Sequence, residues 1–154
     1  MIEKLAENGG VIMINFGSTF ISQESRDHFD KRKKDKASIK KSAKMPDDSP
    51  KLKEILATYD KQTPRIYATD ENLADHIDHV VNLVGIDHVG FGSDYDGGGD
   101  SLPTGLKDAS TYPNLIRVLL ERGYSDGHIE KICSGNILRV WKAVEEHAAQ
   151  SRPL

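Results

Sequence analysis

The sequence contains a single cysteine, few aromatic residues, little net charge and no long hydrophobic run. The lone Cys133 excludes an internal disulfide, and its place in a helical pattern predicts a small core residue. No segment reaches the roughly 18 consecutive apolar residues of a membrane-spanning helix, so we expect no membrane span in this chain. The formal net charge of -3 is too small to indicate nucleic acid or an anionic membrane surface as the main partner.

What the sequence does contain is typical of one globular domain: 154 residues, of which 37% are hydrophobic and 29% charged. Residues 1–17 predict the end of a helix at Ile2–Glu7 and a buried strand at Val11–Phe16. Residues 18–64 are polar and lysine-rich and are interrupted by Pro46 and Pro50, which predicts a partly helical insertion on the surface. Acidic residues within the lysine-rich run favour a solvated helical face over a nucleic-acid patch.

Residues 65–100 predict a helix, Glu71–Leu83, and then a short buried strand, Val89–Gly92, while residues 101–150 predict C-terminal helices. A strand, a helix and a second strand in this order indicate an α/β fold with parallel strands and a right-handed crossover. A sheet of only two buried parallel strands cannot have both of its faces covered and both of its edges closed. The sequence therefore predicts a single partial domain of a larger fold.

The most informative segment is the end of the second predicted strand, where Asp94 and Asp96 stand among glycines. Because α/β proteins place their chemistry at the carboxyl ends of strands, this segment is a candidate active site. Two other interpretations stay open here: a polar turn held by Asx-type hydrogen bonds, and a calcium loop that includes Asp100. An EF-hand loop starting at Asp94 fits poorly, because its ligand positions 98 and 105 are both glycine. Asn15 ends the first strand on the same side, where it either contacts a substrate or bonds to backbone.

Two histidines, His76 and His79, lie one turn apart in the predicted helix Glu71–Leu83. Such a pair can bind a transition metal, but the segment lacks the spacing and the glutamate of a zincin helix. We therefore favour structural hydrogen bonds at a helix–sheet interface for both imidazoles. Asp87 and His88 precede the second strand at its amino end, where we expect residues to serve stability.

Several segments, in this order along the chain, closely resemble the C-terminal part of the renal dipeptidase (membrane dipeptidase) family of zinc metallopeptidases. These segments are Gly9–Phe16, Asp75–Val80, Gly85–Gly97, Leu102–Asp108, Tyr112–Leu115 and Gly135–Val140. The resemblance implies an incomplete (β/α)₈ TIM-like barrel of the amidohydrolase type, with two zinc ions at the strand ends in the complete enzyme. It implies dipeptide hydrolysis by a metal-activated hydroxide, with Asp94 as the eighth-strand carboxylate that accepts and passes on the proton. A homo-oligomer of the complete enzyme is compatible with it.

The sequence departs from the family pattern in what it lacks. The family's other metal ligands lie on the first, third, fifth and sixth strands, and its carboxylate-binding arginine follows the sixth strand; this chain has no counterpart to any of these. We expect Met1 to be an internal methionine, the chain to form no complete zinc site by itself, and the isolated chain to be inactive. The alternative is a non-catalytic binding or scaffolding module that pairs with a partner through unpaired strand edges.

Overall fold

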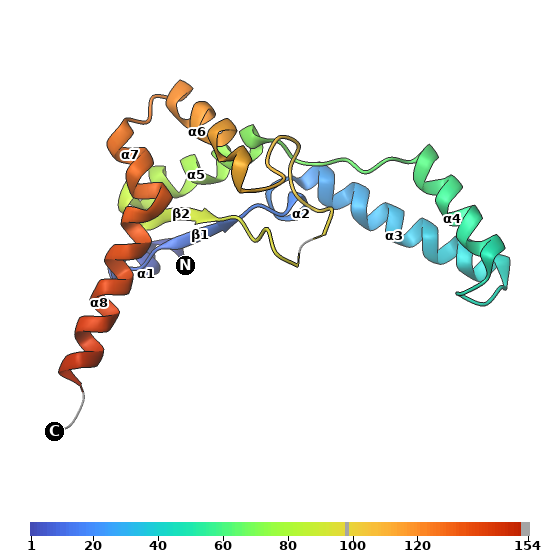
Figure 1. The fold of residues 1–154 in the computed structure, drawn as a ribbon, viewed down its shortest axis with the longest axis horizontal. Coiled ribbons are helices and arrows are strands. Elements are labelled where there is room, and N and C mark those ends of the chain that lie inside the picture. The colour runs from blue at the N-terminus through green and yellow to red at the C-terminus, as the bar shows by residue number, and fades with distance from the viewer. Residues whose placement is uncertain (98, 152–154) are drawn as a thin grey trace.

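Two parallel strands form a small sheet, with helices from both ends of the chain packed around it (Figure 1). The computed structural model describes residues 1–97 and 99–151. The elements in chain order are α1 (Ile2–Glu7), β1 (Ile12–Asn15), α2 (Ser18–Ile21), α3 (Gln23–Ala43), α4 (Pro50–Gln62), α5 (Asp70–Val84), β2 (Val89–Gly92), α6 (Tyr112–Glu121), α7 (Asp126–Glu130) and α8 (Asn136–Gln150). Two 3₁₀ turns, Ile86–His88 and Ala109–Thr111, and a π-helical turn, Lys131–Gly135, complete the set. No described helix is long and apolar enough to cross a membrane.

Strands β1 and β2 pair in parallel, as the strand–helix–strand order predicts, and Asn15 lies opposite Gly92 at the end of the pairing. The crossover helix α5 begins with a capping box. In this box the Thr69 hydroxyl accepts a hydrogen bond from the Asn72 backbone N–H, and the Asn72 side chain accepts one from the Thr69 N–H. Because the strands are parallel, their carboxyl ends meet at the same edge of the sheet.

The glycines of β2 let the two strands pack closely. A Cβ atom at Gly92 would lie 2.8 Å from the carbonyl carbon and oxygen of Met13 in β1, and one at Gly90 would lie 2.8 Å from the Met13 sulfur. The contact at Gly92 is with backbone, which cannot swing away as a side chain can. The alternation of glycine with apolar residues along this strand therefore reflects close packing.

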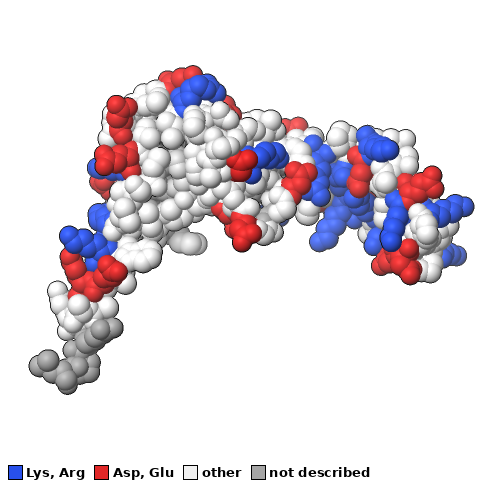
Figure 2. All heavy atoms as spheres, viewed as in Figure 1, with Lys and Arg blue, Asp and Glu red and all other residues white. Residues whose placement is uncertain are grey.

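The longer helices of residues 18–64, α3 and α4, form an arm that projects away from the sheet (Figure 1). Its two helices are joined by the carboxylate of Asp60 in α4, which pairs with Lys36 of α3 at 2.6 Å and with Arg32 of the same helix. The hydrogen bond from Lys36 holds the pKa of Asp60 below its usual value. Charged side chains of both signs cover the arm (Figure 2).

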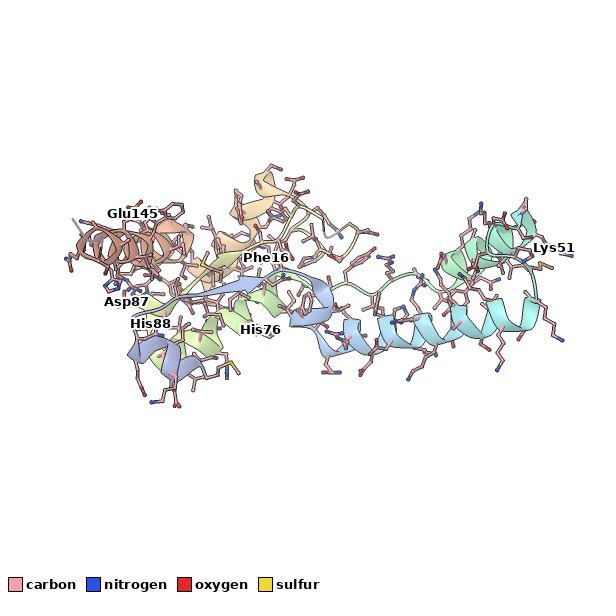
Figure 3. The ribbon with its side chains drawn as sticks, turned by 90° about the horizontal axis from the view of Figure 1, so that it is seen from below. Phe16, Lys51, His76, Asp87, His88 and Glu145 are labelled. Atoms are coloured by element: carbon pink, nitrogen blue, oxygen red, sulfur yellow. The ribbon has the colours of Figure 1, made fainter. Side chains whose placement is uncertain are left out.

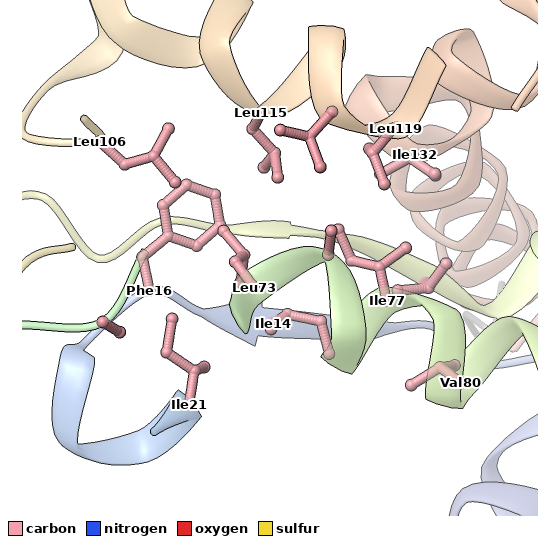
Figure 4. Packing of buried hydrophobic residues seen from close by; sticks show 14 of the residues in the cluster. Ile14, Phe16, Ile21, Leu73, Ile77, Val80, Leu106, Leu115, Leu119 and Ile132 are labelled. Carbon is pink, nitrogen blue, oxygen red and sulfur yellow. The ribbon is translucent and has the colours of Figure 1, made fainter. Parts of the chain in front are cut away.

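The hydrophobic core lies between the sheet, α5 and α6 (Figure 4). Leu73 and Ile77 of α5 and Leu115 and Leu119 of α6 are all fully buried. Burying a leucine or isoleucine side chain contributes about 1.5–3 kcal/mol relative to leaving it exposed. The burial of these four side chains therefore stabilises the packing of α5 and α6 against the sheet. Phe16, directly after β1, extends the core toward the carboxyl ends of the strands and is also fully buried.

The π-helical turn and α8 cover the amino ends of the strands. Asn136, itself buried, donates hydrogen bonds from Nδ2 to the carbonyl oxygens of Ile86 and Val89 at 2.7 and 2.8 Å. In the π-helical turn Ile132 takes the buried position and Cys133 is exposed. The prediction that Cys133 is a core residue is therefore wrong, because the wider turn changes which side chain faces the core.

Candidate functional site

The side chains of Asn15 and Asp94 meet at the carboxyl ends of the two strands. Asn15 Nδ2 donates a hydrogen bond of 2.7 Å to Asp94 Oδ2. The amide oxygen of Asn15 in turn accepts a 2.7 Å hydrogen bond from the Gly17 backbone N–H. Both ends of the Asn15 amide are therefore used, which fixes its orientation and leaves its NH₂ group directed at the exposed carboxylate of Asp94.

Asp94 has a backbone conformation that few non-glycine residues adopt. Its φ of 54° lies in the left-handed region, which costs on the order of 1 kcal/mol and persists only where neighbours hold the backbone. The preceding residue is held by a 2.8 Å hydrogen bond from the Tyr112 hydroxyl to Ser93 Oγ. The following residue, Tyr95, packs its ring against Phe16, with the centroids 5.8 Å apart. The chain leaves the sheet at Asp94 between these two anchors.

Four aromatic side chains pack together next to this strand end. This aromatic cluster consists of Phe16, Phe91, Tyr95 and Tyr112; the rings of Phe91 and Tyr112 are stacked with centroids 5.6 Å apart. The Tyr95 hydroxyl is buried next to the Thr111 side chain, but the two do not reach hydrogen-bond geometry, and no other described residue bonds to it. Burial raises the pKa of Tyr95. Sequence reasoning missed this cluster, although both phenylalanines occur in the predicted strands.

The carboxylates of the acidic segment do not gather around one point. Asp94 bonds to Asn15, whereas Asp100 accepts hydrogen bonds from the Tyr67 hydroxyl and from Lys107 Nζ, the latter at 3.4 Å. The hydrogen bond from Tyr67, with help from Lys107, lowers the pKa of Asp100. Among residues 1–97 and 99–151, no group of three or more His, Cys, Asp or Glu side chains is arranged to hold a metal ion.

The two histidines of α5 lie outside any interface. His76 and His79 are both exposed, so the expectation that they form hydrogen bonds at a helix–sheet interface is wrong. The same helix buries Leu73, Ile77 and Val80 instead. Within the described residues, these histidines belong to no group of side chains that is arranged to hold a metal ion.

Asp87 and His88 lie at the opposite end of the sheet from Phe16, next to α8 (Figure 3). His88 Nδ1 is 2.8 Å from the carbonyl oxygen of Gly10, and the Asp87 carboxylate is 2.7 Å from Lys131 Nζ. The hydrogen bond from Lys131 lowers the pKa of Asp87. These partners tie the amino ends of the strands to the chain on either side, in keeping with the expected contribution to stability.

An ion cluster between α5 and the end of α6 was not anticipated from the sequence. The guanidinium of Arg122 lies 2.9 Å from Asp75 and 2.6 Å from Asp78, and it also reaches Glu71. Burial alone would lower the pKa of Arg122, but its hydrogen bonds to these carboxylates raise it. Tyr124 donates a 2.6 Å hydrogen bond to Asp78, and burial together with this bond raises the pKa of Tyr124. The acids recur along one side of α5, and this spacing is the signal that could have indicated a shared cation.

The chain is similar to curated dipeptidases. Dipeptidase tcpJ of Claviceps purpurea is 46% identical over 90 residues, which are 56% of this chain and 20% of that protein. Dipeptidase 3 of Homo sapiens is 41% identical over 87 residues, 56% of this chain and 18% of that protein. An uncharacterized dipeptidase of Schizosaccharomyces pombe is 32% identical over 151 residues, 97% of this chain and 27% of that protein. The chain thus spans about a fifth to a quarter of the length of these relatives.

Solved structures and a family comparison agree with these relatives. The probable dipeptidase PvdM from Pseudomonas aeruginosa superposes with a TM-score of 0.65 at 28% identity, over 91% of this chain and 38% of that one. Dipeptidase AC, a metallopeptidase of family M19, shares the fold alone, with a TM-score of 0.55 at 23% identity over 88% of this chain and 28% of that one. The model of the family described as membrane dipeptidase (peptidase family M19) matches residues 1–153. The chain belongs to the membrane dipeptidase family, peptidase family M19.

Proposed function

We propose that this chain contributes the carboxylate of Asp94 to the active site of a dipeptidase that hydrolyses the peptide bond of dipeptides. The observation that supports this most directly is the 2.7 Å hydrogen bond between Asn15 and Asp94 at the carboxyl ends of adjacent parallel strands. In barrel enzymes that edge carries the chemistry. Membership of a family whose relatives are named dipeptidases supplies the reaction class.

The roles of the two side chains follow from their chemistry. Asn15 donates a hydrogen bond to one oxygen of the Asp94 carboxylate, which fixes the direction of that group. We assign to Asp94 the transfer of a proton from the attacking water to the leaving amine of the dipeptide. Because Asn15 lies beside the carboxylate of Asp94, a substrate that contacts Asp94 also lies near Asn15. We therefore assign to Asn15 a contact with the substrate.

The described residues do not by themselves fit a metal centre. Metal sites in hydrolases use three or more protein ligands, and Asp94 meets only the amide of Asn15 at the strand ends. We therefore derive no step through a metal. We propose instead that the complete dipeptidase is a (β/α)₈ barrel that binds two zinc ions, and that the ligands come from parts of it outside these 154 residues.

Substitution in a complete enzyme tests this assignment. We would build a chimera in which this chain replaces the matching segment of an active family dipeptidase, and measure dipeptide hydrolysis. Asp94→Asn keeps the shape of the side chain but removes the proton acceptor, so kcat should fall by about 100-fold or more. Asp96→Asn, two residues away and also exposed, is the matched control and should change kcat little. Equal kcat values for the two variants would remove Asp94 from the mechanism.

The isolated chain provides a second test. Because the strand ends supply one carboxylate and one amide, the 154-residue chain with added zinc should hydrolyse no dipeptide above background. Folding of the sample is established first by circular dichroism, so that absence of turnover reports on the site. Robust turnover by the chain alone would contradict the proposal that the remaining active-site residues lie elsewhere.

A further inference from the structure

Tyr112 contacts the chain on both sides of Asp94. Its hydroxyl donates a 2.8 Å hydrogen bond to Oγ of Ser93, the residue directly before Asp94. Its ring lies 5.5 Å, centroid to centroid, from the ring of Tyr95, the residue directly after Asp94. The same ring is stacked on Phe91 of β2, with the centroids 5.6 Å apart. A single side chain from outside the sheet thus meets this segment at three points.

Tyr112 is the first residue of α6, and this helix is anchored in the core. Leu115 and Leu119 of the helix are fully buried. The turn that precedes the helix is also held, because the Asp108 carboxylate accepts hydrogen bonds from the backbone N–H and the hydroxyl of Ser110, at 2.8 and 2.5 Å. The Tyr112 hydroxyl therefore belongs to a regular element whose own position is fixed.

The backbone at Asp94 depends on such support. Its φ of 54° is a left-handed conformation that costs a non-glycine residue free energy and persists only where neighbouring structure holds it. The side chain of Asp94 is exposed and gains little from packing, and its carboxylate is oriented by the amide of Asn15. The residues on either side of Asp94 must therefore fix where its backbone lies, and Tyr112 contacts both of them.

We propose that Tyr112 is a positioning residue for Asp94. Its hydroxyl holds Ser93 directly after β2, and this bond sets the place of the Asp94 carboxylate beside the Asn15 amide. The catalytic consequence rests on the proposed function of Asp94, whereas the positioning itself is a property of this chain and can be measured in it. A displacement of about 1 Å in a catalytic group can lower a rate about 100-fold, so the loss of one hydrogen bond here is sufficient to reduce turnover.

Two other tyrosines supply matched controls for the loss of a hydroxyl. The Tyr95 hydroxyl belongs to the same aromatic cluster but has no hydrogen-bond partner among the described residues. The Tyr124 hydroxyl donates a 2.6 Å hydrogen bond to Asp78 in the ion cluster between α5 and the end of α6, so its loss removes a hydrogen bond outside the strand end. Substitution by phenylalanine keeps the ring at each of the three positions. Of the three substitutions, only Tyr112→Phe removes a hydrogen bond to a neighbour of Asp94.

Nuclear magnetic resonance of the 154-residue chain tests the positioning without any reaction. The side-chain NH₂ protons of Asn15 report on Asp94, because this group is hydrogen-bonded to its carboxylate. In Tyr112→Phe these signals should move upfield, because the carboxylate is displaced and the hydrogen bond weakens. They should keep their place in Tyr95→Phe and in Tyr124→Phe. Unmoved Asn15 signals in Tyr112→Phe would overturn the proposal.

Turnover is measured in the chimeric dipeptidase. Tyr112→Phe should lower kcat about tenfold with little change in KM, because the group that it displaces is the proton acceptor. Ser93→Ala removes the acceptor of the same hydrogen bond and should give an equal loss, and the double variant should lose no more than either single variant. Tyr124→Phe also loses a hydrogen bond but should leave kcat unchanged. Equal kcat values for Tyr112→Phe and Tyr124→Phe would contradict the positioning role.

Combination with Asp94→Asn separates positioning from a general structural effect. Once the proton acceptor is gone its position no longer matters, so Tyr112→Phe should leave the residual kcat of Asp94→Asn unchanged. A purely structural effect would lower kcat by the same factor in both backgrounds. If Asp94→Asn itself keeps full kcat, the proposed function fails, and the Asn15 signals still decide whether Tyr112 positions Asp94. If Asp94→Asn lowers kcat and Tyr112→Phe does not, Tyr112 is no positioning residue and the proposed function stands.

Discussion

Asn15 and Asp94 are 79 residues apart in the sequence, yet the amide of the first donates a 2.7 Å hydrogen bond to the carboxylate of the second. Parallel pairing of β1 with β2 brings them together, because it places the two carboxyl ends at one edge of the sheet. The Gly17 backbone N–H holds the far side of the Asn15 amide. A carboxylate at a strand end is thus supported by an oriented donor from the neighbouring strand.

The first prediction concerns the charge at position 15. In the chimeric dipeptidase, Asn15→Asp places a second carboxylate beside Asp94 and removes the donor to it. Repulsion between the two carboxylates and the loss of the donor both move Asp94 from its position, so kcat for dipeptide hydrolysis should fall by about tenfold or more. Asn15→Leu removes the donor without adding charge and should give a smaller decrease. An unchanged kcat in Asn15→Asp would contradict the proposed role of the pair.

The second prediction compares two tyrosines of the aromatic cluster. Tyr112→Phe loses the hydrogen bond to Ser93 and should lower the free energy of unfolding by about 0.5–1.5 kcal/mol. Tyr95→Phe removes a buried hydroxyl that has no partner in the described residues, so it should leave that free energy unchanged or raise it. Both substitutions keep the ring, so urea unfolding of the two variants isolates the hydroxyls. Greater destabilisation by Tyr95→Phe would show that its hydroxyl is satisfied.

The third prediction concerns alkaline pH. Burial and the hydrogen bond to Asp78 raise the pKa of Tyr124 in the folded chain above its value of about 10 in the unfolded chain. The unfolded state therefore loses this proton first, so the contribution of Tyr124 is fully present below pH 10 and is lost as the pH rises further. Urea unfolding between pH 8 and 11 should show this decline. Tyr124→Phe has no proton to lose there, and its stability should fall less steeply; an equally steep fall would contradict the assignment.

Regular elements could be predicted from the sequence because their signals are local. The apolar spacing that predicts a helix at Glu71–Leu83 corresponds to α5 at Asp70–Val84, and the parallel order places Asn15 on the side of Asp94. Local signals do not report long-range partners. The spacing of the acids on α5 could have indicated a shared cation, but no local signal identifies it as Arg122, which lies 44 residues beyond Asp78.

The remaining differences also have physical causes. The exposure of Cys133 follows from a π-helical turn, which changes the phase of the helix and carries no residue signature of its own. The left-handed backbone at Asp94 depends on tertiary contacts of its neighbours Ser93 and Tyr95. Because the sequence does not show these contacts, it does not distinguish a polar turn from an active-site carboxylate at this position. The exposure of His76, in contrast, could have been predicted from the sequence. The apolar residues of α5 that recur at helical spacing are the buried ones, and His76 is not among them.

The fourth prediction concerns the close approach of the strands. Gly92→Ala would place a Cβ 2.8 Å from the carbonyl carbon and oxygen of Met13, so β1 or β2 must shift. Overpacking of this kind costs about 1–3 kcal/mol, and the shift would move Asn15 and Asp94 apart as well. Gly127→Ala in α7 is the matched control, because its nearest contact is the Ser125 hydroxyl oxygen at 3.9 Å. Alanine there should be neutral or stabilise the chain by up to about 1 kcal/mol. Urea unfolding distinguishes the two, and a Gly92→Ala chain as stable as the unsubstituted one would show that the strands tolerate a wider spacing.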